Sequence, residues 1–433
     1  MDQIISDNIL ASGFLVIWIL TFLWYHYKNR IFDGGSVVIA FYIVYAVFSI
    51  ITINDYIFAN EFLPLTVFPY IYLYVMMMIA LAPAIYHHIY PPKNIANPNT
   101  RLLTLAGLLI VFCAFMQIPD IISNFQTGIV KLFLDSDAGK DAYEEHIRDA
   151  GESGGAISNL SSVIYNSLFD ISIFIFFYFL TLKKKNILLI LALAASIFIG
   201  TLIPIMSGLR GGVIISIQTI ICGYMLFRRF LSKRINRIAN ITGITAIIIL
   251  SLPIIAISVS RFSQRNYGVM GAISWYVGQG SLYFNNYGLD AGGIRYGDRT
   301  LNLFKRVIDP ENTPKNFVER RDKYPSLDID DYYYTTFVGD FSLDFGPITA
   351  FVIFILFFLW LLLNIRNKDE EIQLHQLLLL YFCLCVSIQG GMSLFYYSDT
   401  SNLRIITCFM LYAYLRYHEA LLEKFPLNIH IRS

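Results

Sequence analysis

The chain has 433 residues, of which 56% are hydrophobic and 15% are charged, and its formal net charge is +1. A soluble protein of this size cannot bury so much apolar side chain, and a nearly neutral chain has no general attraction for nucleic acid. The five cysteines lie in apolar segments without a CxxC pair, so we expect neither disulfides nor a metal site from them.

Uncharged runs of about 20 residues recur along the chain and predict an all-α, polytopic integral membrane protein with about eleven transmembrane helices. The N-terminus carries Asp2 and Asp7 where a cleaved signal would be basic, and the first run is long enough to span. The last run is the weakest because Arg404 and Arg416 enclose a short apolar core. The expected spans are 8–25, 34–54, 62–86, 102–119, 157–182, 186–209, 211–227, 238–260, 345–365, 376–398 and 400–418.

Lysine and arginine predict the orientation, because they are retained on the inner side of a membrane. With the N-terminus outside, seventeen of them fall in inner segments and five in the short outer connections. We therefore expect eight helices in residues 1–260, with a first outer loop at 120–156. A large extracytoplasmic loop follows at 261–336, and residues 337–433 hold the last three helices and an inner tail.

A lone arginine among glycines joins the sixth and seventh spans, in Met206-Ser207-Gly208-Leu209-Arg210-Gly211-Gly212. If a helix begins near Gly211, its free N–H groups and positive dipole end lie beside Arg210. Arginine suits that position if an anion, typically phosphate, binds between them. Ser207, Gly211 and Gly212 would then help to bind it. The alternative interpretation, given equal weight, is that Arg210 snorkels to the lipid headgroups.

The long outer loop interleaves aromatic and polar residues in a way that favours a sugar-binding surface. Trp275, Tyr283 and Tyr287 offer ring faces on which sugars stack, and amides and carboxylates beside them can bind hydroxyls. The alternative is an aromatic belt at headgroup depth. The other members of the pattern are Tyr276, Phe284, Tyr296, Gln279, Asn285, Asn286, Asp290, Arg295 and Asp298.

Three further arginines are candidates for anion binding. Arg261 and Arg265 follow the C-terminal end of a predicted helix, where the dipole already favours cations. Arg404 follows a run of capping residues at the outer start of the last helix, so Arg404 and Arg210 together could clamp a diphosphate. A salt bridge from Arg404 to Asp399 is the competing interpretation.

Two sets of carboxylates are candidates for proton transfer. Asp340 and Asp344 are four residues apart, so a helix would place both on one face, where mutual repulsion raises one pKa as a general base requires. The alternative is a pair of capping carboxylates at the headgroup boundary. Asp170 lies within a span, one turn after Asn166, and could couple protons in a transporter or accept a structural hydrogen bond.

The stretch Ser207 to Gly211 and the stretch Tyr334 to Gly346, which contains Asp-Phe-Gly, resemble the Wzy-type O-antigen or oligosaccharide repeat unit polymerases. The similarity in architecture covers nearly the whole chain, and the motifs cover about a tenth of it. The resemblance implies a helical membrane glycosyltransferase of the C type in the bacterial inner membrane, with its active site facing the periplasm. No cofactor or metal is implied.

The implied reaction transfers a glycan from undecaprenyl diphosphate to the sugar of a second lipid-linked repeat unit, at the outer membrane face. The product would be O-antigen, capsule or exopolysaccharide. Arginines would hold the leaving diphosphate, and a chain-length regulator, a flippase and membrane lipids are the expected partners. His146 is the only outer histidine, so the identity of the base stays open. The alternatives are an O-antigen ligase and a transporter of lipid-linked sugars.

Overall fold

The computed structural model describes residues 2–58, 60–96, 100–125, 156–206, 209–262, 268–315, 317–366, 370–395 and 399–424. Within these ranges the chain is almost entirely helical. The two strands, β1 (Asn94–Ile95) and β2 (Glu371–Ile372), form one short parallel pair. The helices are α1 (Asp2–Lys28), α2 (Gly34–Asn54), α3 (Val67–Ile89), α4 (Thr100–Phe115), α5 (Ile118–Phe125), α8 (Ala156–Thr181), α9 (Ile187–Met206), α10 (Arg210–Phe227), η2 (Arg228–Phe230), α11 (Lys233–Phe262), α12 (Gly268–Tyr287), α13 (Asn302–Ile308), α14 (Phe317–Lys323), α15 (Thr336–Phe345), α16 (Pro347–Ile365), α17 (Leu374–Gly390) and α18 (Asp399–Lys424).

Nine helices in the described ranges are long and apolar enough to cross a membrane, which confirms an all-α, multi-pass membrane protein. The helix α17 is apolar but only 17 residues long. Each predicted run overlaps a helix, although the fourth run, 102–119, is divided between α4 and α5. The predicted outer segment 120–156 lies mostly outside the described residues, and His146 with it.

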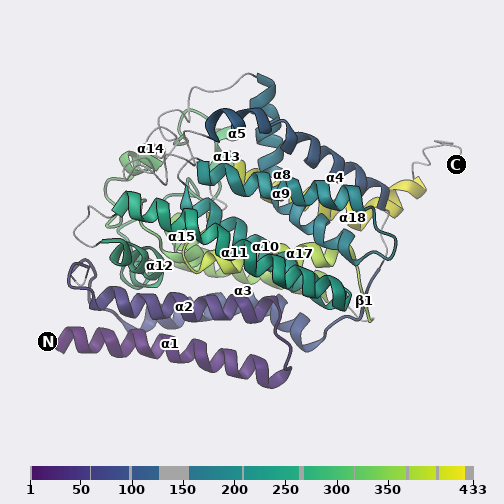
Figure 1. The fold of residues 1–433 in the computed structure, drawn as a ribbon. Coiled ribbons are helices and arrows are strands. Elements are labelled where there is room, and N and C mark those ends of the chain that lie inside the picture. Colours follow the sequence, from purple (N-terminus) through teal and green to yellow (C-terminus); the bar gives the residue numbers. More distant parts are fainter. Residues whose placement is uncertain are drawn as a thin grey trace, which may run out of the picture.

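The long helices lie side by side along one common direction (Figure 1). The elements α12–α15 gather at one end of this bundle, where α1 also begins, and we call it the loop end. The β1–β2 pair and the last turns of α18 lie at the opposite end. That end also carries the exposed lysines 183–185 and the residues 228–237, and we call it the basic end. This relative placement agrees with the sides expected from the distribution of lysine and arginine.

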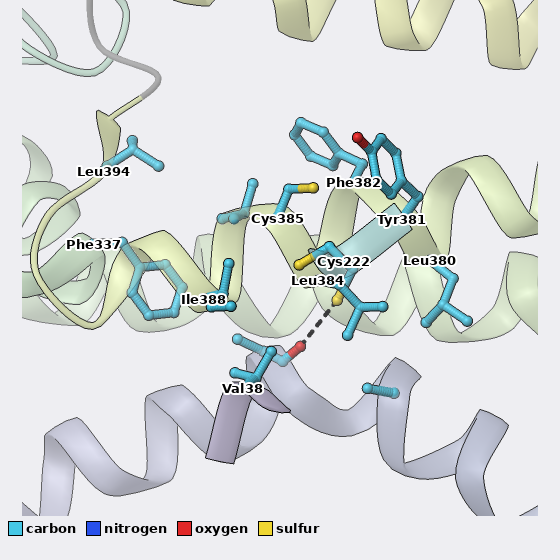
Figure 2. Packing of buried hydrophobic residues seen from close by; sticks show 14 of the residues in the cluster. Val38, Cys222, Phe337, Leu380, Tyr381, Phe382, Leu384, Cys385, Ile388 and Leu394 are labelled. Carbon is cyan, nitrogen blue, oxygen red and sulfur yellow. Dashed lines mark hydrogen bonds between the residues drawn. The ribbon is translucent and has the colours of Figure 1, made fainter. Parts of the chain in front are cut away.

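The helix α17 forms the centre of the bundle, and nearly all of its side chains are buried. A helix that is hydrophobic around its whole circumference requires neighbours on every side. Figure 2 shows Val38 of α2, Cys222 of α10 and Phe337 of α15 facing it. The last turn of α17 packs closely, because a Cβ on Gly390 would lie 2.4 Å from the ring of Phe337.

The helix α12 docks against α2 at the loop end, through small residues and hydroxyl groups. Ser49 donates a hydrogen bond of 2.7 Å to the carbonyl of Gly278, and Thr52 donates one of 2.8 Å to the carbonyl of Ser274. A Cβ on Gly278 would lie 2.4 Å from the carbonyl oxygen of Phe48. This contact fixes the position of α12, which carries most of the predicted aromatic residues.

The substitution Gly278→Ala is expected to destabilise the protein by about 1–3 kcal/mol, because the added methyl group meets backbone and α12 must move away from α2. Thermal unfolding in detergent measures the loss. Gly13→Ala is the matched control, since a Cβ on Gly13 meets nothing within 4 Å. An equal effect of the two substitutions would show that the α2–α12 contact is not tight.

Candidate functional site

Arg210 is the first residue of α10, and its side chain packs against two aromatic rings. The guanidinium carbon lies 4.4 Å from the ring centroid of Phe262 and 4.2 Å from that of Tyr276. In addition, Nη1 donates a hydrogen bond of 3.2 Å to Ser258. The residue is 8% exposed, which differs from the exposed side chain that snorkelling requires. The two ring centroids lie 6.0 Å apart and the ring planes are inclined by 53°, so the rings form a corner around the guanidinium and limit the directions in which it can donate.

The start of α10 has room on one side and tight packing on the other. Its N-cap residue, Leu209, forms no side-chain hydrogen bond to cap the helix. A Cβ on Gly211 would meet nothing within 4 Å, so open space lies beside Arg210. By contrast, a Cβ on Gly212 would lie 2.8 Å from Pro204 of α9. The structure thus gives Gly212 a packing role between α9 and α10, while Gly211 borders free space. Ser207 lies outside the described residues.

An aromatic platform extends from Arg210 along α12. We define the platform as Trp275, Tyr276, Tyr283 and Tyr287 of α12 together with Tyr332, Tyr333 and Tyr334. The hydroxyl groups of Tyr276 and Tyr332 lie 2.9 Å apart, and the rings of Tyr283 and Tyr333 stack at 4.3 Å. Tyr332 remains 47% exposed, whereas Tyr283 is 3% exposed. The platform therefore presents Tyr332 and part of Tyr276 outward, and the predicted Tyr283 is buried against Tyr333.

The amides that were expected to contact a sugar instead attach α12 to the rest of the protein. Asn285 exchanges hydrogen bonds of 2.9 and 2.8 Å with the backbone of Thr66. Gln279 accepts a hydrogen bond of 3.2 Å from the backbone N–H of Tyr334 and is 1% exposed. These two amides therefore serve helix docking, and the predicted sugar surface rests on the aromatic rings.

Asp331 is the centre of a buried ion-pair network that the sequence analysis missed. It accepts hydrogen bonds from Arg295, from Arg299 at 3.3 Å and from Nε of Arg320 at 2.7 Å. Burial alone would raise the pKa of this carboxyl group, but the three guanidinium groups outweigh burial and lower its pKa to about 2. Asp331 is therefore held as a carboxylate.

Asp340 and Asp344 complete this network, and both are fully buried. Asp344 accepts hydrogen bonds from Nε of Arg295 at 2.8 Å and from the N–H of Thr300 at 2.7 Å. Asp340 lies 3.2 Å from Nε of Arg299 and accepts hydrogen bonds from Ser393 and from the N–H of Leu394. The helical spacing does bring both carboxylates toward the same pair of arginines. Their enclosure gives them a structural role in the network, and we do not assign either as a general base.

The network holds the tyrosine run of the platform in place, because Asp331 directly precedes Tyr332. Thr336 lies two residues after this run, and its φ of 66° is rare for a β-branched residue. The N–H of Thr336 donates a hydrogen bond of 2.8 Å to the carbonyl of Met392. A strained residue of this kind persists only where its surroundings fix the backbone, and such residues cluster at functional sites.

The remaining predicted arginines do not join Arg210 in the described contacts. Arg404 donates to the carbonyl of Asn166 at 2.8 Å and pairs with Asp170 at 3.5 Å, whereas Asp399 was the expected partner. The described contacts of Arg404 therefore lie on α8, and those of Arg210 lie on α11 and α12. Arg261 belongs to the last turn of α11 instead of following it, and Arg265 lies outside the described residues.

Tyr287 lies at the far end of α12 from Arg210. It lines a cavity of about 200 Å³ together with Asp290, Ser342 and Pro347. The ring of Tyr287 also lies 6.4 Å from that of Tyr283 and nearly parallel to it. The structure thus places the three predicted aromatic residues on one helix but not at a single point.

The described part of the chain holds no group of three or more His, Cys, Asp or Glu side chains positioned to bind a metal ion. What the residues do form is a fixed guanidinium beside a partly exposed aromatic surface. No family model, no curated protein and no solved structure matches this chain.

Proposed function

We propose that this membrane protein is a glycosyltransferase that joins lipid-linked oligosaccharide repeat units into a polysaccharide. The observation that supports the proposal best is the setting of Arg210. Its guanidinium packs against the rings of Phe262 and Tyr276 at a helix start, and the exposed Tyr332 lies next to Tyr276. A lipid diphosphate linked to a sugar needs these two features side by side, a positively charged group for the phosphate and an aromatic face for the sugar.

The proposed chemistry uses Arg210 to stabilise the leaving group. The acceptor hydroxyl oxygen forms a bond to the anomeric carbon of the donor glycan, and the bond from that carbon to the diphosphate oxygen breaks. Negative charge develops on the diphosphate as it leaves, so a positively charged group fixed in advance lowers the barrier. The proton of the acceptor hydroxyl passes to a base that we leave unassigned.

The transporter alternative rested on Asp170 as an isolated carboxylate within the membrane. In the structure Asp170 lies 3.5 Å from Arg404, and this ion pair between α8 and α18 favours the structural alternative for Asp170. The transporter therefore stays the second candidate. We therefore retain undecaprenyl-diphosphate-linked glycans as proposed donor and acceptor, and the outer membrane face as the proposed site of reaction.

Reconstitution tests the proposal directly. The purified protein is placed in liposomes with lipid-linked repeat units from a cell that makes a repeating polysaccharide, and the glycans are analysed by gel and mass spectrometry. We expect products of two or more repeats with release of polyprenyl diphosphate. If glycan lengths stay unchanged while the lipid-linked units change leaflets, the protein is a transporter. If glycan moves only to added lipid A core, it is a ligase.

A further inference from the structure

A large apolar crevice opens between α8, α9, α10 and α11, away from the site at the loop end. Its volume is about 740 Å³, within the range of roughly 300–1,000 Å³ that is typical of ligand pockets. Phe177, Ile190, Ile221 and Ile247 are among the apolar side chains that line it. The crevice belongs to helices of membrane-spanning length, so its natural content is hydrocarbon.

The crevice is long enough to hold a lipid chain. Along α11 it extends from Ile235 to Leu250, which corresponds to about 22 Å of helix. Half of a bilayer hydrocarbon core measures about 15 Å. Only 11% of the apolar window of α11 is buried within the protein, so this helix faces the surrounding lipid along most of its length.

Basic residues flank the crevice where it reaches the basic end. The α8–α9 connection carries exposed lysines at 183–185, directly between the crevice residues Leu180 and Ile190. The first turns of α11 carry exposed Arg234 and Arg237 on either side of Ile235, which also lines the crevice. The sequence has no aspartate or glutamate from residue 171 to residue 289. These segments therefore offer positive charge without acidic neighbours in the chain.

A neutral polar group marks the same end of the crevice. Tyr224 and Asn240 both line it, and the Tyr224 hydroxyl donates a hydrogen bond of 2.7 Å to the amide of Asn240. No charged side chain is among the residues that line the crevice, and the flanking basic residues lie at its rim. A basic rim, a neutral polar pair and a mostly apolar lining suit the phosphate, the esters and the acyl chains of a phospholipid.

We propose that the crevice binds an anionic diacyl phospholipid. Its phosphate contacts Arg234, Arg237 and the lysines at 183–185, and its acyl chains lie between α9 and α11. Basic pockets between transmembrane helices are known to bind acidic headgroups, because each nearby Lys or Arg attracts them. The lipid would join the lipid-exposed helix α11, whose end contacts Arg210, to the body of the bundle. The proposal does not depend on the proposed transfer reaction.

Gly243 provides a test of the acyl site. It lines the crevice, and a Cβ there would meet nothing within 4 Å, so a large side chain projects into open space. Gly243→Phe should occupy the crevice and lower the phosphatidylglycerol retained by the purified protein at least fivefold, as measured by native mass spectrometry after incubation with this lipid. Gly13→Phe is the matched control, because Gly13 also faces open space but lies on α1, and its retention should equal that of the wild type.

The headgroup is tested by a second pair of variants. Arg234→Gln/Arg237→Gln should lower the preference for phosphatidylglycerol over phosphatidylcholine roughly tenfold, because two attracting charges are lost. Lys93→Gln/Arg366→Gln removes two exposed basic side chains elsewhere and should preserve the preference. Equal retention by wild type and Gly243→Phe would overturn the proposal, as would an unchanged preference in the Arg234/Arg237 variant. Retention of polyprenyl phosphate in place of phospholipid would assign the crevice to a different lipid and also overturn it.

Discussion

Arg210→Lys is expected to reduce glycan polymerisation by roughly 100- to 1,000-fold, the range seen when a single fixed group that stabilises developing negative charge is removed. Lysine keeps the positive charge but lacks the planar group that packs against Phe262 and Tyr276. Its ammonium is therefore neither held in one orientation nor able to donate two parallel hydrogen bonds to a phosphate. The measurement is the rate of chain extension by the purified variant in liposomes.

Arg404→Lys is the matched control for this experiment, since it changes a second arginine that was also predicted to bind the diphosphate. Its guanidinium donates to the carbonyl of Asn166 and pairs with Asp170, so we expect a modest loss of stability and near-normal chain extension. Thermal unfolding of both variants separates misfolding from a lost reaction. Normal chain lengths from a stable Arg210→Lys protein would contradict the role of Arg210. An equal loss of chain extension in both variants would favour a diphosphate clamp made by the two arginines.

The helical architecture was largely predictable, because the membrane imposes it. Uncharged runs must become helices when no water satisfies the backbone, so α2 has the predicted bounds of 34–54. The boundary of α11 was predicted less well, since Arg261 continues the helix that the first charge was expected to end. A charge stops an apolar run in the sequence, but it does not stop a helix that leaves the membrane.

The candidate site was predictable only where the signal is local. Arg210 was identified by its contrast with an uncharged surrounding, which a single sequence displays. Its partners Phe262 and Tyr276 are 52 and 66 residues further along the chain, and nothing in their own neighbourhood indicates a contact with an arginine. The same limit explains the missed network. Asp331 pairs with arginines from three positions of a long loop, and only the fold brings them together.

The carboxylates at 340 and 344 show what the spacing of two residues predicts and what it leaves out. Their spacing does turn both toward one surface of α15. The sequence suggested mutual repulsion, but it did not show that Arg295 and Arg299 occupy the space beside them. Both carboxylates are paired with arginines in the structure, and a role for either as a general base stays a prediction.

Asp331→Asn is expected to destabilise the protein by about 3–5 kcal/mol, because it leaves buried arginines without their shared carboxylate. Chemical or thermal unfolding in detergent measures the loss. Asp330→Asn is the adjacent control. Its carboxylate is 37% exposed, lies 3.7 Å from Arg321 and should contribute at most about 1 kcal/mol. Equal losses in the two variants would show that the network does not hold the loop.

The pH dependence of stability gives a second test of the role of Asp331. The pKa of Asp331 is about 2 in the folded protein, below the value of about 3.9 for an unfolded aspartate. Its stabilising contribution is therefore fully present above the unfolded pKa and is lost as the pH falls through the folded pKa. The difference in stability between wild type and Asp331→Asn should stay constant from pH 7 to about pH 5 and shrink toward pH 2. If the difference in stability persists at pH 2, its cause is a packing change that asparagine introduces. The charge of Asp331 would then not be what holds Tyr332 in the platform.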